Sequence, residues 1–301
     1  MPRLRVVASR LNRGLGAAIV YALLIVFAFT FAYPLLYMVV TSLKTTQEYV
    51  NPLITWIPTQ LDWQNYLTAL TQLHYFSAAR DTLIVAASGA AAQVVAACFI
   101  GYGFGRPSLA FRGRGLLLGL VVLTLVVPPQ TIIVALYELY STFHMINTPW
   151  PFIVPGLFGQ GLKGGLFILI FRQAYAALPV DVEEAGRLDG ASPWRIWWRL
   201  MLPQTGPAIT VSAVLAFIWQ WNAFFEPSMF LNNSKFTTLP LQLGATISNV
   251  LNQPAFETFS AYNMSVIFAE ALITVVPVLI GYALVSGWFL DSFSRVGVPS
   301  D

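Results

Sequence analysis

Long apolar segments constrain the fold of this 301-residue chain more than any other feature of its sequence. Six of them are near or above the ~20 residues that a helix needs to cross the hydrocarbon core of a bilayer. Inside a bilayer each segment must satisfy its own backbone hydrogen bonds, which favours helices. Only 10% of the residues are charged, whereas soluble domains average about 25%. We therefore predict an all-α membrane protein whose six spans lie at residues 15–41, 82–105, 115–137, 151–173, 206–231 and 264–290.

The fourth predicted span is rich in glycine, a residue that lets helices approach closely, so we expect this span inside the bundle. Lys163 lies among these glycines. Three interpretations of Lys163 are open: it pairs with Glu138 or Glu270, it gates an outer cavity, or the span boundary is elsewhere than expected.

The basic residues predict the orientation of the chain. With the N-terminus in the cytoplasm, all of the 16 Lys and Arg residues lie on the inner side except Lys44, Arg80, Lys163 and Lys235. This distribution follows the positive-inside rule. An even number of spans returns the C-terminus to the same side. We expect a cytoplasmic segment 1–14, a membrane domain 15–290 and a cytoplasmic tail 291–301.

Two longer segments, residues 44–80 and 232–263, are then expected on the outer side. In the first of them, Asp62 is expected to cap a short helix from Trp63 to about Leu73.

Other common chemistries find little support in the sequence. The two histidines, His74 and His144, fall in different predicted outer loops, so no metal site is expected. The single cysteine, Cys98, cannot form an intrachain disulfide. The sequence has no Gly-x-x-x-x-Gly-Lys-Ser/Thr loop of the kind that cradles the phosphates of ATP. We expect no cofactor and no catalytic site in this chain.

Residues 179–203 form a charged island between two apolar segments. Asp181, Glu183 and Glu184 would occupy the first turn of a helix, where carboxylates favour the positive end of the helix dipole. Asp189-Gly190 is a turn signal that should end this helix. The island therefore begins as the first arm of a predicted helical hairpin.

The second arm of the hairpin should begin at Ser192 as an N-cap, followed by Pro193 at the first helical position. Pro203 is expected to end this second helix. The arm interleaves several aromatic side chains with Arg195 and Arg199. Such residues are enriched in protein contact surfaces, but they also suit the lipid interface. Composition alone leaves both interpretations open.

The spacing of this island resembles the EAA loop of ABC-importer permeases. The matching residues are Glu184-Ala185-Gly186, then Gly190, then Leu200-Met201-Leu202-Pro203. Gly186 stands where the family has a second alanine, and Leu200 stands where isoleucine is commoner.

Other segments resemble the maltose-type carbohydrate-uptake branch of that family. They are Pro128-Pro129 in the third span, the run from Trp219 to Phe224, and Thr238-Leu239-Pro240. The C-terminal tail departs from the usual ending of that branch.

The resemblance implies a six-span type I ABC importer permease with a cytoplasmic coupling-helix hairpin at residues 176–205. Such a chain pairs with a second, related permease in the inner membrane of a bacterial or archaeal cell. Two cytoplasmic subunits bind ATP, and an extracytoplasmic binding protein delivers the substrate. The residues expected to couple to the ATPases are Glu183, Glu184, Ala185, Gly186, Asp189, Gly190, Ala191, Trp194, Leu202 and Pro203.

Polar side chains inside spans are costly, and they usually face a cavity or a partner helix. Sugars are held by amide and carboxylate groups together with aromatic faces. The candidates for the substrate pathway are Gln130, Tyr137, Trp219, Gln220, Asn222, Glu226 and Glu270. The alternative is that these residues only form hydrogen bonds or packing contacts between helices.

Alternative functions remain at this stage. A near alternative is the same machinery for glycerol phosphate, a polyamine or another small solute. An ion-coupled secondary transporter is a more distant alternative, and it would favour internal repeats and a titratable relay in the membrane. The sequence does not identify the sugar.

Overall fold

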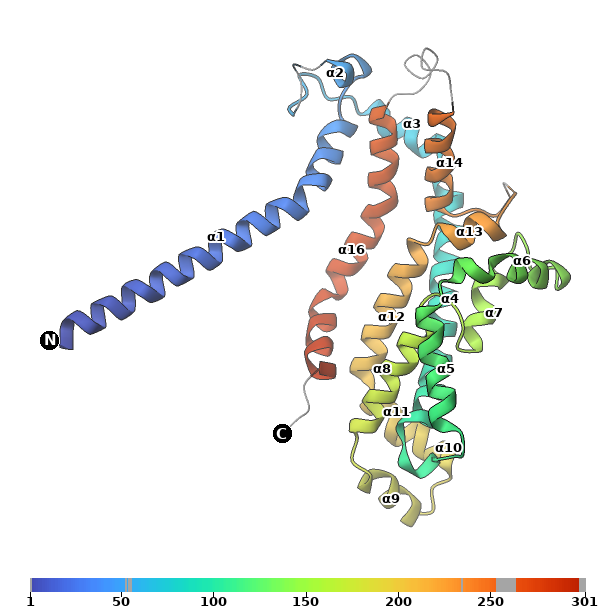
Figure 1. Ribbon diagram of the computed structural model, residues 1–301. Helices are drawn as coiled ribbons and strands as arrows, with labels where there is room; N and C mark the ends of the chain where they lie inside the picture. The colour runs from blue at the N-terminus through green and yellow to red at the C-terminus, as the bar shows by residue number, and fades with distance from the viewer. Residues whose placement is uncertain (1, 52, 54–55, 234, 253–263, 298–301) are drawn as a thin grey trace. The chain divides into compact units, whose positions relative to one another are not determined.

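A computed structural model describes residues 2–51, 53, 56–233, 235–252 and 264–297 of the chain (Figure 1). The chain forms two compact units. The first holds Met1–Gln72 and Ile247–Ile273, and the second holds Leu73–Thr246 and Thr274–Asp301. The predicted outer loop 232–263 and the tail 291–301 lie partly outside the described residues.

The first unit contains α1 (Pro2–Ser42), α2 (Thr46–Val50), α3 (Gln64–Gln72), the end of α14 (Leu239–Leu251) and the start of α16 (Met264–Gly297). Gly16–Ser42 is long and apolar enough to cross a membrane, in agreement with the first predicted span. The Asn65 amide donates to the carbonyl oxygens of Ser42 (3.0 Å) and Lys44 (2.9 Å), which holds α3 beside the end of α1. The Asp62 carboxylate accepts from the N–H of Gln64 at 3.0 Å, so Asp62 caps α3 as predicted.

The second unit is a helical bundle with a hairpin at one end (Figure 1). Its helices, besides the rest of α14 and α16, are α4 (Tyr75–Gly105), η1 (Pro107–Leu109), α5 (Arg114–Val126), η2 (Pro129–Ile132), α6 (Ile133–Thr142), α7 (Trp150–Leu157), α8 (Gly164–Ala177), α9 (Asp181–Leu188), α10 (Pro193–Ile196), η3 (Trp197–Met201), α11 (Leu202–Gln204), α12 (Gly206–Trp221) and α13 (Phe225–Phe230).

Helix α4 forms the centre of this bundle and packs against α8 through two glycines. A Cβ atom on Gly101 would lie 2.4 Å from the Cβ of Phe171, and one on Gly105 would lie 2.7 Å from the Cβ of Tyr175. Small residues four positions apart allow membrane helices to approach this closely. Phe171 and Tyr175 are buried in the core that the two helices share. Because of this contact, α4 and the C-terminal half of α8 form one rigid framework for the hairpin.

Among the described residues, three helices are each long and apolar enough to cross a membrane: α1, α4 and α16. Three further pairs of helices are bent at a short break, and the number of possible spans rises to six if each pair counts as one. The third predicted span, 115–137, is bent. The chain bends by 96° between Arg114–Val126 and Pro129–Thr142. Pro128 and Pro129 lack backbone N–H groups, and a proline disfavours helical geometry in the residue before it.

The fourth predicted span, 151–173, is not one continuous helix. Helix α7 ends at Leu157, and α8 begins at Gly164 and continues to Ala177. Between them, Gly159, Gly161 and Lys163 have φ angles of 74°, 122° and 61°. These left-handed conformations end a right-handed helix. Lys163 therefore lies in the turn before α8, and of the three interpretations the misplaced boundary is the one that the structure supports. As predicted, α8 lies inside the bundle.

The fifth predicted span is shorter than expected, because α12 ends at Trp221 and a separate helix, α13, covers Phe225–Phe230. The Thr238-Leu239-Pro240 segment that follows is bound to α4. The Asp81 carboxylate accepts from the N–H of Thr237 at 3.3 Å, and the Thr82 hydroxyl accepts from the N–H of Leu239 at 2.8 Å. These buried contacts connect the start of α14 to the N-terminal part of α4.

Candidate functional site

The hairpin at the lower end of the second unit in Figure 1 has the local structure that the sequence predicts. Helix α9 carries Asp181, Glu183 and Glu184 in its first turn. Gly190 follows with a φ of 74°, which glycine adopts without strain. The hydroxyl of Ser192 then accepts from the N–H of Arg195 at 3.4 Å and caps the second arm, and Pro193 occupies its first turn.

Pro203 does not end the second arm, which corrects the prediction. The arm runs from α10 through the π-helical turn η3 into α11, and α11 ends at Gln204. The N–H of Leu202 donates to the carbonyl of Trp197 across this wider turn. The side-chain amide of Gln204 donates to the carbonyl of Leu200 at 2.7 Å. A π-turn adds one residue to a helix, and here it accommodates a proline one residue before the end.

The two arms of the hairpin meet at Gly186. A Cβ atom at this position would lie 2.8 Å from Cδ1 of Leu200 and 3.2 Å from Cγ1 of Ile196. Gly186 and Leu200 are the two positions at which this sequence departs from the EAA pattern. Because they are in contact, the absent methyl group of one departure makes room for the side chain of the other.

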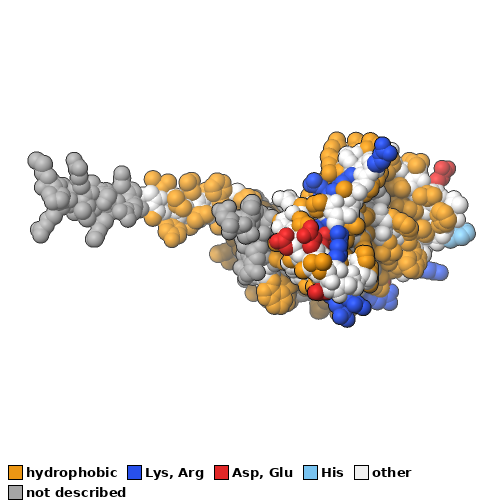
Figure 2. Space-filling view, turned by 90° about the horizontal axis from the view of Figure 1, so that it is seen from below, with side chains coloured by type: hydrophobic (Ala, Val, Ile, Leu, Met, Phe, Trp, Pro, Cys, Tyr) orange, Lys and Arg blue, Asp and Glu red, His pale blue; other side chains and the backbone are white. Residues whose placement is uncertain are grey.

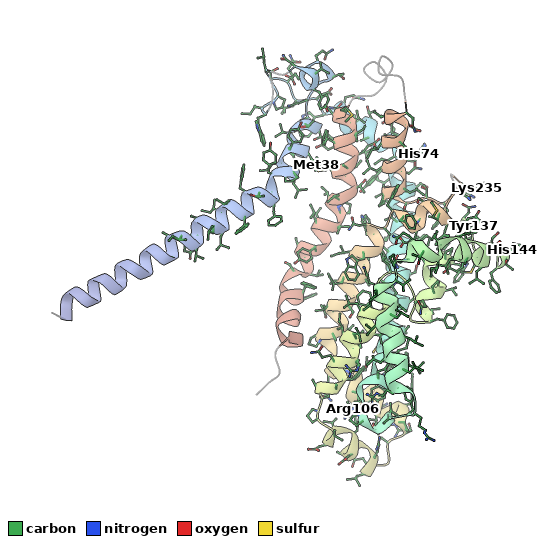
Figure 3. All side chains as sticks on the ribbon, in the orientation of Figure 1. Met38, His74, Arg106, Tyr137, His144 and Lys235 are labelled. Atoms are coloured by element: carbon green, nitrogen blue, oxygen red, sulfur yellow. The ribbon has the colours of Figure 1, made fainter. Side chains whose placement is uncertain are left out.

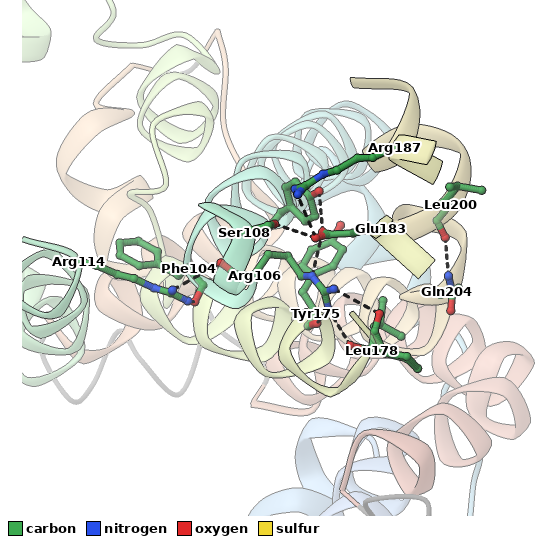
Figure 4. A network of polar contacts seen from close by, with 12 residues as sticks. Phe104, Arg106, Ser108, Arg114, Tyr175, Leu178, Glu183, Arg187, Leu200 and Gln204 are labelled. Atoms are coloured by element: carbon green, nitrogen blue, oxygen red, sulfur yellow. Dashed lines mark hydrogen bonds and ion pairs between the residues drawn. The ribbon is translucent and has the colours of Figure 1, made fainter. Parts of the chain in front are cut away.

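A buried ion pair attaches the hairpin to the end of α4 (Figure 4). Arg106 donates through Nε to Oε1 of Glu183 at 2.8 Å, and each side chain is only 1% exposed. Tyr102 donates to the same oxygen at 2.9 Å, and Ser108 donates to Oε2 at 2.7 Å. Arg187 lies on the same helix with its Nη2 3.9 Å from Oε2 of Glu183. We call Tyr102, Arg106, Ser108 and Glu183 the inner clasp.

The guanidinium of Arg106 also binds the end of α8. It donates to the carbonyls of Tyr175 (3.0 Å), Leu178 (2.6 Å) and Pro179 (3.3 Å). The carbonyl of Tyr175 belongs to the last turn of α8, and those of Leu178 and Pro179 belong to the segment that leads into α9. One buried charge therefore joins α4, α8 and α9. The Nε, Nη1 and Nη2 atoms of Arg106 each donate to at least one oxygen, and such bonds offset the cost of burying the charge.

The electrostatics of the inner clasp favour the ionised carboxylate. Burial alone would raise the pKa of Glu183, but hydrogen bonds from Ser108, Arg106 and Tyr102 outweigh burial and hold its pKa below the usual value. A depressed pKa means that the charged form stabilises the fold at neutral pH and that this contribution is lost as the pH falls through the folded-state pKa.

The other residues of the predicted coupling set differ in exposure. Glu183 and Gly186 are buried, Ala191 and Leu202 are half-buried, and the exposed members are Glu184, Ala185, Asp189, Gly190, Trp194 and Pro203. Leu188, beside the turn, is 89% exposed. Figure 2 shows this end of the molecule, where acidic and basic side chains gather beside hydrophobic ones. The buried members hold the shape of the hairpin, and the exposed members form its accessible surface.

The candidates for the substrate pathway do not form one cluster in the second unit. Gln220 is buried, with Nε2 3.0 Å from the place of a Cβ on Gly89, and Trp219 packs on Phe167 with ring centroids 5.6 Å apart. Asn222 is exposed, and its amide donates to the carbonyl of Ile218 at 2.9 Å. Gln220 and Trp219 therefore make packing contacts, and Asn222 makes a hydrogen bond to the carbonyl one helical turn before it.

Other candidates lie on a different part of the same unit. Tyr137 on α6 is exposed, and its hydroxyl accepts from the Asn232 amide at 3.4 Å. Figure 3 places Tyr137 with His144 and Lys235, far from Arg106 at the hairpin end. Gln130 is exposed in η2, and Glu226 is half-buried in α13. Glu270 is buried in the part of α16 that belongs to the first unit.

Sequence reasoning did not identify Tyr102, Arg106 and Ser108 as part of the site. The available signal was Arg106 directly after the apolar run of α4, because a charge at that position must reach water or a partner. Within the described residues, no group of three or more His, Cys, Asp or Glu side chains is placed to hold a metal ion.

Comparisons with known proteins agree with this architecture. Residues 93–289 match the sequence profile of the family described as "Binding-protein-dependent transport system inner membrane component". The arabinooligosaccharides transport system permease protein AraQ of Halalkalibacterium halodurans is 24% identical over 274 residues, which cover 90% of this chain and 92% of that protein. The diacetylchitobiose uptake system permease protein NgcG of Streptomyces coelicolor is 28% identical over 283 residues, covering 93% and 88%.

A solved structure has the same fold. It is the crystal structure of a bacterial ABC transporter involved in the import of the acidic polysaccharide alginate. One of its chains matches with a TM-score of 0.75 and 22% sequence identity, covering 90% of this chain and 96% of that one. At this identity the likeness concerns the fold alone.

Proposed function

Because the chain belongs to the family of binding-protein-dependent transport system inner membrane components, we propose that it is the sugar-conducting permease subunit of an ABC importer. Permease subunits of this family are transport proteins of the inner membrane and work with an ATPase and a binding protein. The observation that carries the proposal is the family match over residues 93–289, which includes the hairpin held by the inner clasp.

The sugar substrate rests on the relatives. The similar proteins named above transport arabinooligosaccharides and diacetylchitobiose according to their names. We propose a mono- or oligosaccharide for this chain, with a second, related permease completing the pathway. Ion-coupled transport is not supported by this family. Among the pathway candidates, the exposed side chains of Gln130, Tyr137 and Asn222 are the ones free to meet a sugar hydroxyl or ring face.

The hairpin is proposed as the docking element for a cytoplasmic ATPase, with the N- and C-termini on the same side of the membrane. Its exposed surface around Glu184, Leu188 and Asp189 combines carboxylates with an apolar side chain. ATP is bound by the partner subunits. The inner clasp would transmit movement of the docked hairpin directly to α4 and α8, because the ion pair joins all three helices.

A matched pair of glycine variants tests the docking role. Gly190 and Gly113 both have a positive φ, 74° and 86°, and a Cβ on either would meet nothing within 4 Å. Proline cannot adopt a positive φ, so Gly190→Pro and Gly113→Pro each disturb a turn, and Gly190→Pro also removes the N–H that donates to the carbonyl of Arg187 at 3.0 Å. We expect Gly190→Pro to abolish ATPase stimulation by the loaded binding protein while the chain still inserts, and Gly113→Pro to retain most of it. Full stimulation with Gly190→Pro would refute the docking role.

The sugar is tested by purifying the importer with its own binding protein and screening neutral and acidic oligosaccharides for binding. Tight binding of a polyamine or a glycerol phosphate, with no binding of any sugar, would refute this part of the proposal.

A further inference from the structure

The second arm of the hairpin exposes two tryptophans that docking of α9 does not explain. Trp194 is 60% exposed and Trp198 is 56% exposed. The opposite face of the same arm is covered, because Ile196 and Trp197 are 2% and 5% exposed and pack in the core. Large aromatic side chains on one open face indicate a surface that something else covers.

These two tryptophans continue a surface that begins on the membrane helix α4. The ring of Phe99 stacks on Trp194 with centroids 5.7 Å apart and an angle of 13°, and Trp194 stacks on Trp198 at 6.4 Å and 12°. We call Phe99, Trp194 and Trp198 the aromatic ladder.

Phe99 is also exposed, and it ends a stripe of exposed apolar residues four positions apart on α4: Leu83, Ala87, Ala91, Val95 and Phe99. Phe99 lies six residues before the end of α4, which corresponds to about 9 Å along the helix. The ladder therefore leads from the apolar surface of a membrane helix toward its inner end. Tryptophan is enriched at this depth, where its ring meets both hydrocarbon and polar headgroups.

Each exposed tryptophan is followed by an exposed arginine, Arg195 after Trp194 and Arg199 after Trp198. In the part of the chain that the structure describes, neither arginine has a carboxylate within ion-pair distance. A helix residue is rotated by about 100° from the one before it, so the guanidinium groups lie beside the ladder rather than on it. Two unpaired cations beside an aromatic surface complement an anionic headgroup layer.

We propose that the aromatic ladder, together with Arg195 and Arg199, binds anionic lipids of the inner leaflet. The rings insert at the interface, and the guanidinium groups bind the headgroup phosphates. This surface anchors the second arm to the membrane while α9 and the turn remain accessible to the ATPase. Lipid fits better than the ATPase, because the ladder is continuous with the apolar stripe of α4. The inference rests on the proposed placement of the hairpin at the inner face.

Lipid retention tests the proposal directly. The assembled importer is placed in nanodiscs of phosphatidylcholine and phosphatidylglycerol, extracted, and its retained lipids are counted by native mass spectrometry. The variant is Arg195→Gln/Arg199→Gln, and the control is Arg112→Gln, another exposed arginine near the inner end of the bundle. We expect the double variant to bind phosphatidylglycerol about 25-fold more weakly, from about fivefold per arginine, and the control to stay near the wild type.

Unchanged retention in the double variant, or an equal loss in the control, would overturn the proposal. A second readout separates lipid from protein as the occupant. In lipid-depleted detergent, the double variant and Trp198→Ser should still co-purify with the ATPase subunits. Loss of the ATPase from these variants would show that the ladder is a protein interface and would also overturn the proposal. Failure of the wild-type chain to co-purify with any ATPase would instead refute the proposed function.

Discussion

Removing the carboxylate of Glu183 should loosen the hairpin by an amount that follows from the contacts of the inner clasp. Glu183→Ala takes away three hydrogen bonds to a buried charge, from Arg106, Tyr102 and Ser108. Breaking a buried ion pair by removing one partner costs about 3–5 kcal/mol. The lower end applies here, because Arg106 keeps the carbonyls at the end of α8 as acceptors.

A loss of about 3 kcal/mol corresponds to about a 150-fold higher population of the open hairpin. Amide hydrogen exchange in α9 reports this population when closing is fast. We expect exchange of the α9 amides to accelerate by about that factor in Glu183→Ala, and exchange in α12 to stay unchanged. In Glu183→Gln, the exchange rate of the α9 amides should lie between those of the wild type and of Glu183→Ala, since a neutral amide oxygen still accepts hydrogen bonds.

The control is Glu184→Ala, which removes the exposed neighbouring carboxylate. This variant should leave exchange in α9 within about threefold of the wild type, because exposed charges contribute about 1 kcal/mol or less. Wild-type exchange rates in Glu183→Ala would refute the reasoning, because the inner clasp would then contribute nothing to holding the hairpin.

Three further predictions concern packing and pH. Gly101→Ala should destabilise the bundle by about 1–3 kcal/mol, since its new methyl group would meet Phe171, whereas Gly103→Ala meets open space and should not; thermal unfolding in detergent compares the two. Gly186→Ala should cost about 1 kcal/mol through its contact with Leu200, and Leu200→Ala in the same chain should relieve the clash, which a double-mutant cycle measures. The pKa of Glu183 lies below its usual value of 4.5, so the carboxyl should stay ionised until the pH falls below 4.5. Infrared spectroscopy detects the protonated acid, and the band is assigned by its absence in Glu183→Gln. A band that appears near pH 6 would contradict the inner clasp.

Local rules were sufficient for the cap and the turn of the hairpin, although not for the end of its second arm at Gln204. The N-cap at Ser192 and the turn at Gly190 depend on neighbours within a few residues, so sequence patterns predict them. The first and last spans were predicted for a similar reason, because long uninterrupted apolar runs have few alternatives in a bilayer.

Longer-range features were beyond these rules. Glu183 and Arg106 are 77 positions apart, and only the close approach of α4 and α8 brings them together. The bends in the third and fourth spans were signalled by Pro128-Pro129 and by the glycines, but hydropathy counts apolar residues and does not detect left-handed turns. The contact of Gly186 with Leu200 likewise depends on how the two arms fold back on each other.

The π-turn at Trp197–Met201 helps to set the direction in which side chains at the tip of the hairpin face relative to those of α11. A single-residue deletion inside it would restore the ordinary helical repeat and leave the tip facing nearly the same way, because a π-turn holds one residue more than an α-turn over nearly the same rotation. A deletion in α10, on the tip side of the π-turn, would instead turn Trp194 by about 100° about the axis of the arm and away from its neighbour Phe99. The position of a deletion in this short stretch therefore matters as much as its length, because only the π-turn carries a residue that the arm can lose without changing which way the hairpin faces.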